Sequence, residues 1–445
     1  MTRKPQTRKL SPPGIASRQA AASLLTAVLR KKTPLDRALI REMSQGGLGA
    51  LSPRDKAFAR LLAVTALRRK GQVEDALARF MKKPLPVKAE SAHRALQLGA
   101  VELLFLDAPA HAAVSSAVAV AVTDRHAVPF KGLVNAVLRR VALARSQILE
   151  SQDAPALNVP SWLRESWAAA YGGTIAHEIA CALLTTPALD ITPKGAGDAE
   201  AMAGALDARV LPTGSLRRPL GGAIEALPGF AQGQWWVQDA AAALPVTFLG
   251  DVKGRPVIDL CAAPGGKTAQ LAARGARVTA LDRAGGRLRL IEQNLKRLDL
   301  SARLVEADAR HWRPAEPTPF VVLDAPCTAT GTIRRHPDVM HLKRPEDLKN
   351  LLPLQARLLD AATEMMAPGG LLIYCTCSLQ VEEGEQQIQA FLSRHRTMRR
   401  RPITPDEVGG CASFITPSGD LRTLPSQWPE CGGLDGFFAA RLVKS

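Results

Sequence analysis

From Arg255 onward, short apolar runs alternate with stretches of helical periodicity, and this alternation constrains the fold more than any other feature of the chain. Five of the runs have the composition of buried strands: residues 257–260, 277–281, 304–305, 320–323 and 371–374. Strands that alternate with helices form a parallel sheet with helices on its faces. The sequence therefore predicts an α/β Rossmann-like domain over residues 251–445, with residues 437–443 closing the sheet as an antiparallel edge.

The first strand leads into a glycine-rich turn made of Cys261, Ala262, Ala263, Pro264, Gly265, Gly266 and Lys267, with a helix expected from Thr268. Backbone amides freed by the two glycines at a helix N-terminus let a ligand approach closely. Asp282 ends the second strand, where a carboxylate can accept both hydroxyls of a ribose. Asp308 follows the third strand, where it or a nearby amide could read an adenine edge.

Two common phosphate-binding patterns fail at this turn. A P-loop would need glycine where Cys261 stands, and the three spaced glycines of a dinucleotide site are absent. A nucleoside with little phosphate fits the turn better than a nucleotide does.

Two later strands end in cysteines. Residues 320–323 lead into Asp324-Ala-Pro-Cys327, and residues 371–374 lead into Cys375-Thr-Cys377. Because the carboxyl ends of parallel strands meet at one edge, the two motifs can present thiols side by side where catalysis is usually located. Either motif alone is more often packing and turn chemistry. A zinc site made of the three cysteines would lack a fourth ligand at the usual spacing.

The positive charge lies in the first third of the chain. The formal net charge is +17, and residues 1–150 hold 26 Lys and Arg against 10 Asp and Glu, which leaves 32 against 31 for the rest. Such an excess points to a polyanion partner, because neutralising phosphates releases counterions; plain solubility is the alternative. Apolar residues recur at helical spacing through residues 16–147, so this third is predicted to be an all-α bundle behind a basic, disordered arm at residues 1–15.

Between these regions the pattern is mixed. Residues 148–160 contain prolines and polar residues without a period, which is typical of a linker. Residues 161–250 combine short helices and strands and are predicted to form a small α+β subdomain that binds RNA. Core packing is the expected role for at least one of Trp235 and Trp236, and exposure for base stacking is the alternative.

Composition excludes some classes of protein. The chain has no run of eighteen apolar residues, so no membrane span is expected. Seven cysteines, several of them in apolar runs and without an export signal before them, favour a reduced, cytoplasmic interior over a disulfide framework.

Four ordered motifs carry a resemblance. Asp259-Leu-Cys-Ala-Ala-Pro-Gly-Gly-Lys-Thr268, Asp324-Ala-Pro-Cys-Thr-Ala-Thr-Gly331, Thr376-Cys-Ser378 and Asp435-Gly-Phe-Phe438 are similar to the signature of RNA cytosine-C5 methyltransferases. Residues 130–140, Phe-Lys-Gly-Leu-Val-Asn-Ala-Val-Leu-Arg-Arg, resemble the NusB-like domain. The pairing resembles the bacterial 16S ribosomal RNA methyltransferases of the Sun/Fmu type over nearly the whole chain.

The resemblance implies S-adenosylmethionine as methyl donor and ribosomal RNA as partner. It implies that Cys377 adds to C6 of cytosine, that Asp324 binds the cytosine N3 and amino edge, and that Cys327 assists loss of the C5 proton and release. Residues 261–267, with Asp324 beside them, would hold the methionine moiety, Asp282 the ribose and Asp308 the adenine side. The extra Cys375 makes a Cys-x-Cys pair with Cys377, so the motif alone does not separate the two thiols as the family's nucleophile. A cytoplasmic monomer without a metal is expected.

Two other functions stay open at this stage. An RNA-binding assembly factor with an inactive transferase domain would be signalled by loss of Cys377 or Asp324, and both are present. A DNA cytosine-C5 methyltransferase would use the thiol of the Pro-Cys motif as nucleophile. The Thr376-Cys377 pair and the basic helical domain argue against that alternative.

Overall fold

The computed structural model describes residues 14–195, 197 and 199–445. The chain forms two compact units, which we call the helical unit (residues 1–164 and 336–342) and the sheet unit (residues 165–335 and 343–445). The basic arm predicted for residues 1–15 lies outside the described residues, except that Gly14 is described and Ile15 begins the first helix.

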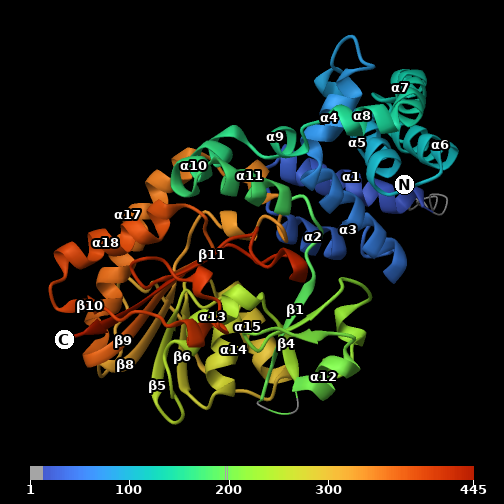
Figure 1. Cartoon of the computed structure of the whole chain (residues 1–445). Helices are drawn as coiled ribbons and strands as arrows, with labels where there is room; N and C mark the ends of the chain where they lie inside the picture. The colour runs from blue at the N-terminus through green and yellow to red at the C-terminus, as the bar shows by residue number, and fades with distance from the viewer. Residues whose placement is uncertain (1–13, 196, 198) are drawn as a thin grey trace, which may run out of the picture. The chain divides into compact units, whose positions relative to one another are not determined.

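The helical unit confirms the predicted all-α bundle (Figure 1). Its helices are α1 (Ile15–Leu29), α2 (Leu35–Ser44), α3 (Pro53–Arg68), α4 (Lys70–Ala78), α5 (Glu90–Phe105), α6 (Ala110–Ala121), α7 (Lys131–Leu143), α8 (Arg145–Ser151) and α9 (Ala154–Asn158). The Ser52 side chain accepts a hydrogen bond from the backbone N–H of Asp55 and so caps α3, with Pro53 at its first position. Apolar side chains from α1 to α8, most of them leucine, valine and alanine, fill one core.

The linker predicted for residues 148–160 is wrong in its secondary structure, because α8 and α9 cover most of it. The polar residues that suggested a loop make specific contacts. Asp153 caps α9 by accepting from the N–H of Ala156. Asn158 is buried, donates to Gln72 Oε1 at 2.9 Å and accepts from the Gln72 N–H at 3.1 Å. Short helices fixed by such long-range hydrogen bonds leave no apolar period to detect.

One segment of the helical unit comes from far along the sequence. Residues 336–342, which include the short helix α16 (Val339–Leu342), follow the Asp324–Cys327 motif. The Asp338 carboxylate accepts the N–H of Leu35 at 2.9 Å at the start of α2, and His341 Nε2 lies 2.8 Å from the carbonyl of Leu67. Leu342 packs against the bundle core. The helical unit is therefore not a continuous stretch of sequence.

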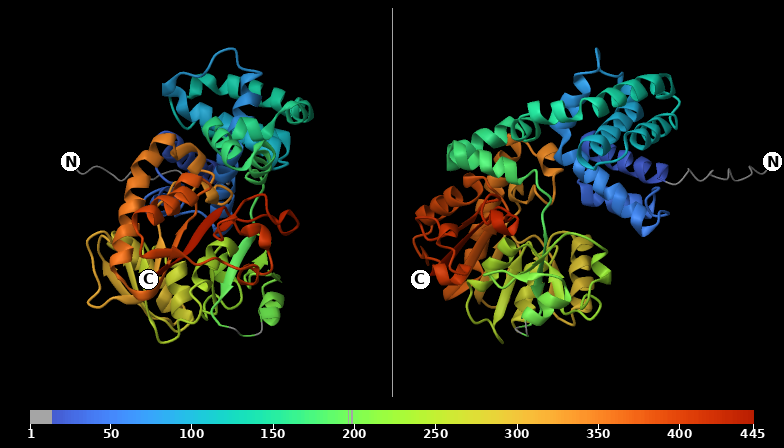
Figure 2. Two further views of the ribbon diagram at one scale, coloured as in Figure 1. Left: turned by 60° about the vertical axis from the view of Figure 1, so that its left-hand side comes forward. Right: turned by 45° about the vertical axis from the view of Figure 1, so that its right-hand side comes forward.

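The sheet unit contains a small antiparallel sheet of order β2-β3-β1-β4. Its elements are β1 (Leu189–Pro193), β2 (Arg209–Val210), β3 (Leu216–Arg218) and β4 (Trp235–Val237), with α11 (Gly173–Ala182), α12 (Ala199–Ala205) and α13 (Ala240–Thr247) nearby in sequence and α10 (Ser161–Tyr171) before them. Figure 2 shows this green sheet beside the yellow helix α15, whose Arg297 donates to the carbonyl of Trp235. Trp235 and Trp236 are both buried, so both pack in the core and neither is exposed for base stacking.

The large sheet has the order β10-β12-β9-β8-β5-β6-β7, with β11 also paired to β12. Its strands are β5 (Pro256–Leu260), β6 (Arg277–Asp282), β7 (Arg303–Glu306), β8 (Thr318–Asp324), β9 (Met366–Thr376), β10 (Met398–Arg400), β11 (Leu421–Thr423) and β12 (Phe437–Lys444). Strands β5 to β9 are parallel, as predicted. Strand β12 is antiparallel to β9, as predicted, but it is not the edge of the sheet, because the unpredicted strand β10 pairs with its other side.

Helices cover both faces of the large sheet (Figure 1). Alternate residues of β5 and β8 pack on α13, α14 (Gly266–Ala273) and α15 (Gly285–Arg297) on one face, and on α17 (Pro345–Glu364) with α18 (Glu385–Arg394) on the other. The carboxyl ends of β5, β6, β8 and β9 therefore emerge together between two packed layers. In the described part of the chain, no helix is long and apolar enough to cross a membrane.

Candidate active site

The glycine-rich turn after β5 has a backbone conformation that lets a ligand approach its main chain closely. Gly265 has φ of +106°, and a Cβ added there would lie 3.0 Å from the side chain of Ile291, so a side chain is disfavoured by both conformation and space. Helix α14 begins at Gly266, two residues before the predicted Thr268. Ala262 and Ala263 are buried, and the Ala262 N–H donates to the carbonyl of Leu281. Gly265 and Gly266 therefore carry no side chains of their own that would keep a ligand away from the backbone amides at the start of α14.

Asp282 ends β6 beside this turn, and its carboxylate is already engaged. It accepts the N–H of Ala263 at 3.3 Å and of Ala284 at 3.1 Å, and it pairs with Arg287 at 3.2 Å. Two carboxylate oxygens accept about four hydrogen bonds, so one acceptor position remains free for a ribose hydroxyl. A second hydroxyl requires Arg287, whose side chain is half exposed, to move aside. Sequence reasoning did not anticipate this arginine.

Asp308 lies in the loop after β7 and is bound by its own neighbour. The Arg310 guanidinium donates to both carboxylate oxygens, and the Arg310 N–H donates to one of them at 3.0 Å. Hydrogen bonds from Arg310 hold the pKa of the Asp308 carboxyl well below its usual range. The carboxylate therefore stays ionised, and its contact with an adenine edge stays a prediction.

The two cysteine motifs end neighbouring parallel strands. Strand register pairs Asp324 of β8 with Cys375 of β9, and the Cys327 and Cys377 sulfur atoms lie 3.5 Å apart just beyond the strands. Cys375 is fully buried, and burial raises the pKa of its thiol well above the ordinary value. Its sulfur lies 3.8 Å from Asp324 Oδ1. The geometry thus separates a facing pair, Cys327 and Cys377, from a core thiol, Cys375.

Cys327 keeps its proton at neutral pH. A hydrogen bond with Cys377 is the main reason that the pKa of Cys327 is raised well above its ordinary value, and burial adds to it. A thiol in this state can hold or donate a proton, whereas a nucleophile must be the thiolate.

Lys267, predicted as part of the cofactor turn, reaches Asp324 at the end of β8. Its Nζ lies 2.8 Å from Asp324 Oδ2 and 4.9 Å from the centre of the Phe437 ring. Lys267 is only 7% exposed and burial works against its charge, but the Asp324 carboxylate outweighs burial and raises the Lys267 pKa. Lys267 therefore remains charged and fixes the orientation of Asp324. The turn after β5 adjoins β8, and this adjacency could not be found from sequence spacing.

The closing Asp435–Phe438 motif belongs to the same site. Gly331 donates its N–H to the carbonyl of Cys377 at 3.0 Å, and Gly436 donates its N–H to the carbonyl of Gly331 at 2.9 Å. A Cβ added at Gly331 would lie 1.8 Å from the oxygen of Gly436. Only glycine permits this contact, and it ties both cysteine loops to the start of β12.

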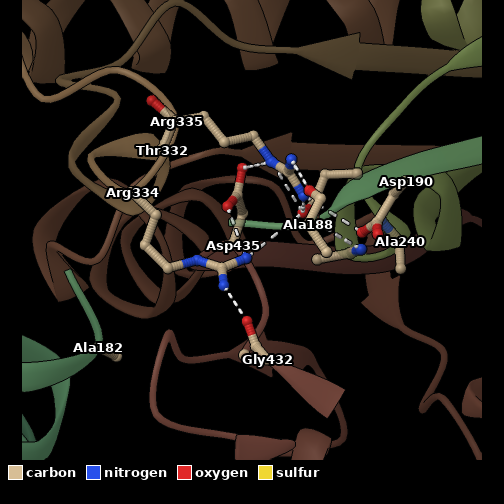
Figure 3. Close-up of polar contacts among 12 residues, drawn as sticks. Ala182, Ala188, Asp190, Ala240, Thr332, Arg334, Arg335, Gly432 and Asp435 are labelled. Atoms are coloured by element: carbon tan, nitrogen blue, oxygen red, sulfur yellow. Dashed lines mark hydrogen bonds and ion pairs between the residues drawn. The ribbon is translucent and has the colours of Figure 1, made fainter. Parts of the chain in front are cut away.

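Two arginines anchor the chain beyond Cys327 (Figure 3). Arg335 donates to Asp239 at 2.6 Å, to Asp435 at 3.1 Å and to the carbonyl of Ala188 at 2.7 Å. Arg334 is 1% exposed and donates to Asp435 at 3.3 Å. Because removing one partner of a buried ion pair leaves an uncompensated charge, this network resists displacement of the loop. In the part of the chain that the structure describes, no three His, Cys, Asp or Glu residues form a group that could hold a metal ion.

Comparison with known proteins places this site in a family. A family model described as 16S rRNA methyltransferase RsmB/F matches residues 246–443, and the NusB family model matches residues 15–143. Ribosomal RNA small subunit methyltransferase B of Cronobacter sakazakii is 35% identical over 412 residues, or 88% of this chain and 92% of that protein. The protein of the same description from Xanthomonas campestris pv. campestris is 35% identical over 450 residues, or 97% and 98% of the two chains. The chain belongs to the ribosomal RNA small subunit methyltransferase B family.

Membership in this family confirms the predicted methyltransferase domain with S-adenosylmethionine as its cofactor, and the predicted NusB-like helical domain. The crystal structure of PH0851 has the same fold, with a TM-score of 0.73 and 22% identity, covering 98% of this chain and all of that one. Members of the family are RNA methyltransferases.

Proposed function

We propose that this protein methylates C5 of a cytosine in small-subunit ribosomal RNA through a covalent intermediate on Cys377. The observation that carries the proposal is the 3.5 Å separation of the Cys327 and Cys377 sulfur atoms, with Asp324 anchored beside them by Lys267. Two facing thiols and an oriented carboxylate match a reaction that needs a nucleophile, a proton acceptor and a group that binds the base.

The residues around β5 fit S-adenosylmethionine. The close approach at Gly265 and the backbone amides at the start of α14 suit the methionine part, and Asp282 offers an acceptor to the ribose. When bound, the cofactor supplies an electrophilic methyl group. Lys267 and Asp324 lie at the edge of this turn, so the base that they orient would face the methyl donor.

Cys377 would act first. C5 of cytosine is a poor nucleophile until a thiolate adds to C6. This addition forms a carbon–sulfur bond, turns the π pair of the C5–C6 bond into a C4–C5 double bond and moves the C4–N3 π pair onto N3, so C5 becomes the nucleophilic carbon of an enamine. Asp324 would bind the N3 and amino edge and so favour the N3-protonated ring that the addition generates. The fully buried Cys375 has no access to a base, which supports Cys377 as the nucleophile.

Cys327 would act last. After C5 carries the methyl group, its proton must leave, and the electron pair of the broken C5–H bond re-forms the double bond as the Cys377–C6 bond breaks. The Cys327 sulfur lies beside the Cys377 sulfur, so the Cys327 thiol would donate its proton to the leaving Cys377 thiolate, and the Cys327 thiolate formed in this way would take the C5 proton.

The helical unit would bind RNA through a groove between α6 and α7. The groove has a volume of about 770 Å³ and an apolar floor, and its lining residues include the exposed His111, Lys131 and Arg139 but no acid. Its donor groups suit phosphates and its floor suits a base. The names of the curated relatives support small-subunit ribosomal RNA as the substrate.

Substitution of each thiol tests the assignment. Cys377→Ala should abolish methylation and covalent trapping of RNA, whereas Cys327→Ala should accumulate a covalent RNA adduct because release fails. Denaturing gels with labelled RNA and with a DNA oligonucleotide of the same sequence measure both. Adducts formed by the Cys377 variant but not by the Cys327 variant would reverse the roles, as in a DNA cytosine methyltransferase. Absence of methylation by the intact chain on RNA and DNA would favour an inactive assembly factor.

A further inference from the structure

Two identical thiols 3.5 Å apart need a difference in their surroundings to take different roles. We propose that Glu383 is the positioning residue that holds Cys327 beside Cys377 and keeps it in the releasing role. The inference rests on the proposed function for the roles of the thiols, but the position of Cys327 can be tested without it.

Glu383 is fully buried and accepts hydrogen bonds from Thr328, the residue that follows Cys327. Its two carboxylate oxygens accept the N–H of Thr328 at 3.0 and 3.2 Å, and one of them also accepts the Thr328 hydroxyl. Gln355 Nε2 donates to the same carboxylate at 2.9 Å, and the Tyr374 hydroxyl donates to the Glu383 carbonyl at 2.7 Å. The side chain therefore ties the loop after β8 to the turn after β9.

The contacts of Glu383 are better suited to positioning than to salt-bridge stability. The donors to its carboxylate are backbone, hydroxyl and amide groups, all of them neutral. A buried carboxylate is costly unless hydrogen bonds compensate it, and several donors around one carboxylate do so only when their geometry is correct. Displacing Thr328 would leave the charge without its main donors, so the loop that carries Cys327 is held firmly.

The two thiols have different charged neighbours, since Glu383 lies near Cys327, and Arg422, which is paired with Glu385 at 2.6 Å, lies near Cys377. The Glu383 carboxylate holds Thr328, next to Cys327, while the buried Arg422 guanidinium donates to the carbonyl of Ser378, next to Cys377. The pKa of Cys327 is raised first by its hydrogen bond with Cys377, then by burial, and further by negative charge that includes Glu383. The negative charge of Glu383 therefore favours the protonated thiol at Cys327.

A cross-linking rate measures the positioning directly. Diamide oxidises two adjacent thiols to a disulfide and is itself reduced to the hydrazine, and mass spectrometry of unreduced peptides quantifies the Cys327–Cys377 link. We expect Glu383→Gln to slow this link at least ten-fold in the full-length protein, because one acceptor oxygen becomes an NH2 group that faces a donor from Thr328 or Gln355. A wild-type rate in this variant would overturn the inference.

Glu382→Gln is the matched control. Glu382 is the preceding residue in the same short 3₁₀ helix (Val381–Glu383), and one of its carboxylate oxygens is buried with no hydrogen-bond partner among the described residues. It should cross-link within two-fold of the wild-type rate, and slowing equal to that of Glu383→Gln would also overturn the inference. If Glu383→Gln does not fold, Thr328→Val removes only the hydroxyl donor and should slow the link about three-fold. An unchanged rate in that variant is then the contrary result.

RNA trapping separates a positioning role from a general structural one. Glu383→Gln should still form the covalent RNA adduct but release it more slowly, and the double variant with Cys327→Ala should behave like Cys327→Ala alone. Equal loss of cofactor binding, adduct formation and release would indicate a structural role and overturn the inference. If no variant of the protein forms an adduct, the proposed function fails while the diamide rates still decide the position of Cys327.

Discussion

Asp259 should make the stability of the sheet unit fall as pH rises, and Asp259→Asn should remove that dependence. The side chain is fully buried at the end of β5, below the cofactor turn. Thr268 donates to its Oδ2 at 2.6 Å, but Oδ1 has no hydrogen-bond partner among the described residues. Burial raises the pKa of the Asp259 carboxyl to about 7, and the Thr268 hydrogen bond and the Lys267 charge only partly oppose it.

The magnitude follows from the difference between folded and unfolded states. A pKa raised from 3.8 to about 7 means that the folded chain binds a proton that the unfolded chain has already lost. The stability associated with that proton is complete below pH 3.8 and is lost as pH rises through about 7. About 3 units at 1.36 kcal/mol each give a loss of roughly 4 kcal/mol. Asparagine has nearly the same shape as the protonated acid, so the variant should match the wild type at low pH and exceed it at pH 8.

Urea unfolding at a series of pH values measures the effect. Five of the six tryptophans lie in the sheet unit, so their fluorescence reports on its unfolding. The free energy of unfolding of Asp259→Asn minus that of the wild type should rise by roughly 4 kcal/mol from pH 4 to pH 8. All other titrating groups are common to the two proteins and cancel. A difference that stays constant across this range to within about 1 kcal/mol would refute the reasoning, because Asp259 would then be ionised in the folded protein.

Two further outcomes are expected. Asp282→Ala should weaken S-adenosylmethionine binding by a few kcal/mol at most, the usual cost of losing charged hydrogen bonds, and unchanged affinity by calorimetry would contradict its place in the cofactor site. Reversing charge with Lys131→Glu and Arg139→Glu in the α6–α7 groove should lower RNA affinity and reduce the slope of log affinity against log salt by about 0.7 to 0.9 per lost phosphate contact. Arg54→Glu with Arg60→Glu is the matched pair of exposed residues on α3, and an equal effect there would argue against the groove.

The discontinuous helical unit changes how its role should be tested. Deleting residues 1–145 would remove the residues that bind Asp338 and His341 and the core against which Leu342 packs. A loss of activity in such a truncation would then have two possible causes, lost RNA binding and the exposure of an apolar segment. Charge reversal on the intact chain avoids this ambiguity.

The sequence by itself determined the class of the fold and the methyltransferase family. Apolar runs of strand length between helical stretches require a parallel sheet, because local periodicity fixes which faces must be buried. The order of the motifs then put the glycine-rich turn and both cysteine loops at one sheet edge. The charge excess in the first third likewise required only a count of residues.

Only the tertiary structure decided which groups meet. Lys267 pairs with Asp324, Cys327 faces Cys377 while Cys375 is set apart, and Glu383 binds Thr328. The residues in each of these contacts are between about 50 and 60 positions apart in the sequence or lie on neighbouring strands. Contacts of this kind depend on strand order, register and burial, and no local pattern encodes them. For the same reason the sequence indicated a linker at residues 148–160 and gave no sign that residues 336–342 complete the helical unit: long-range hydrogen bonds and packing hold both segments in place.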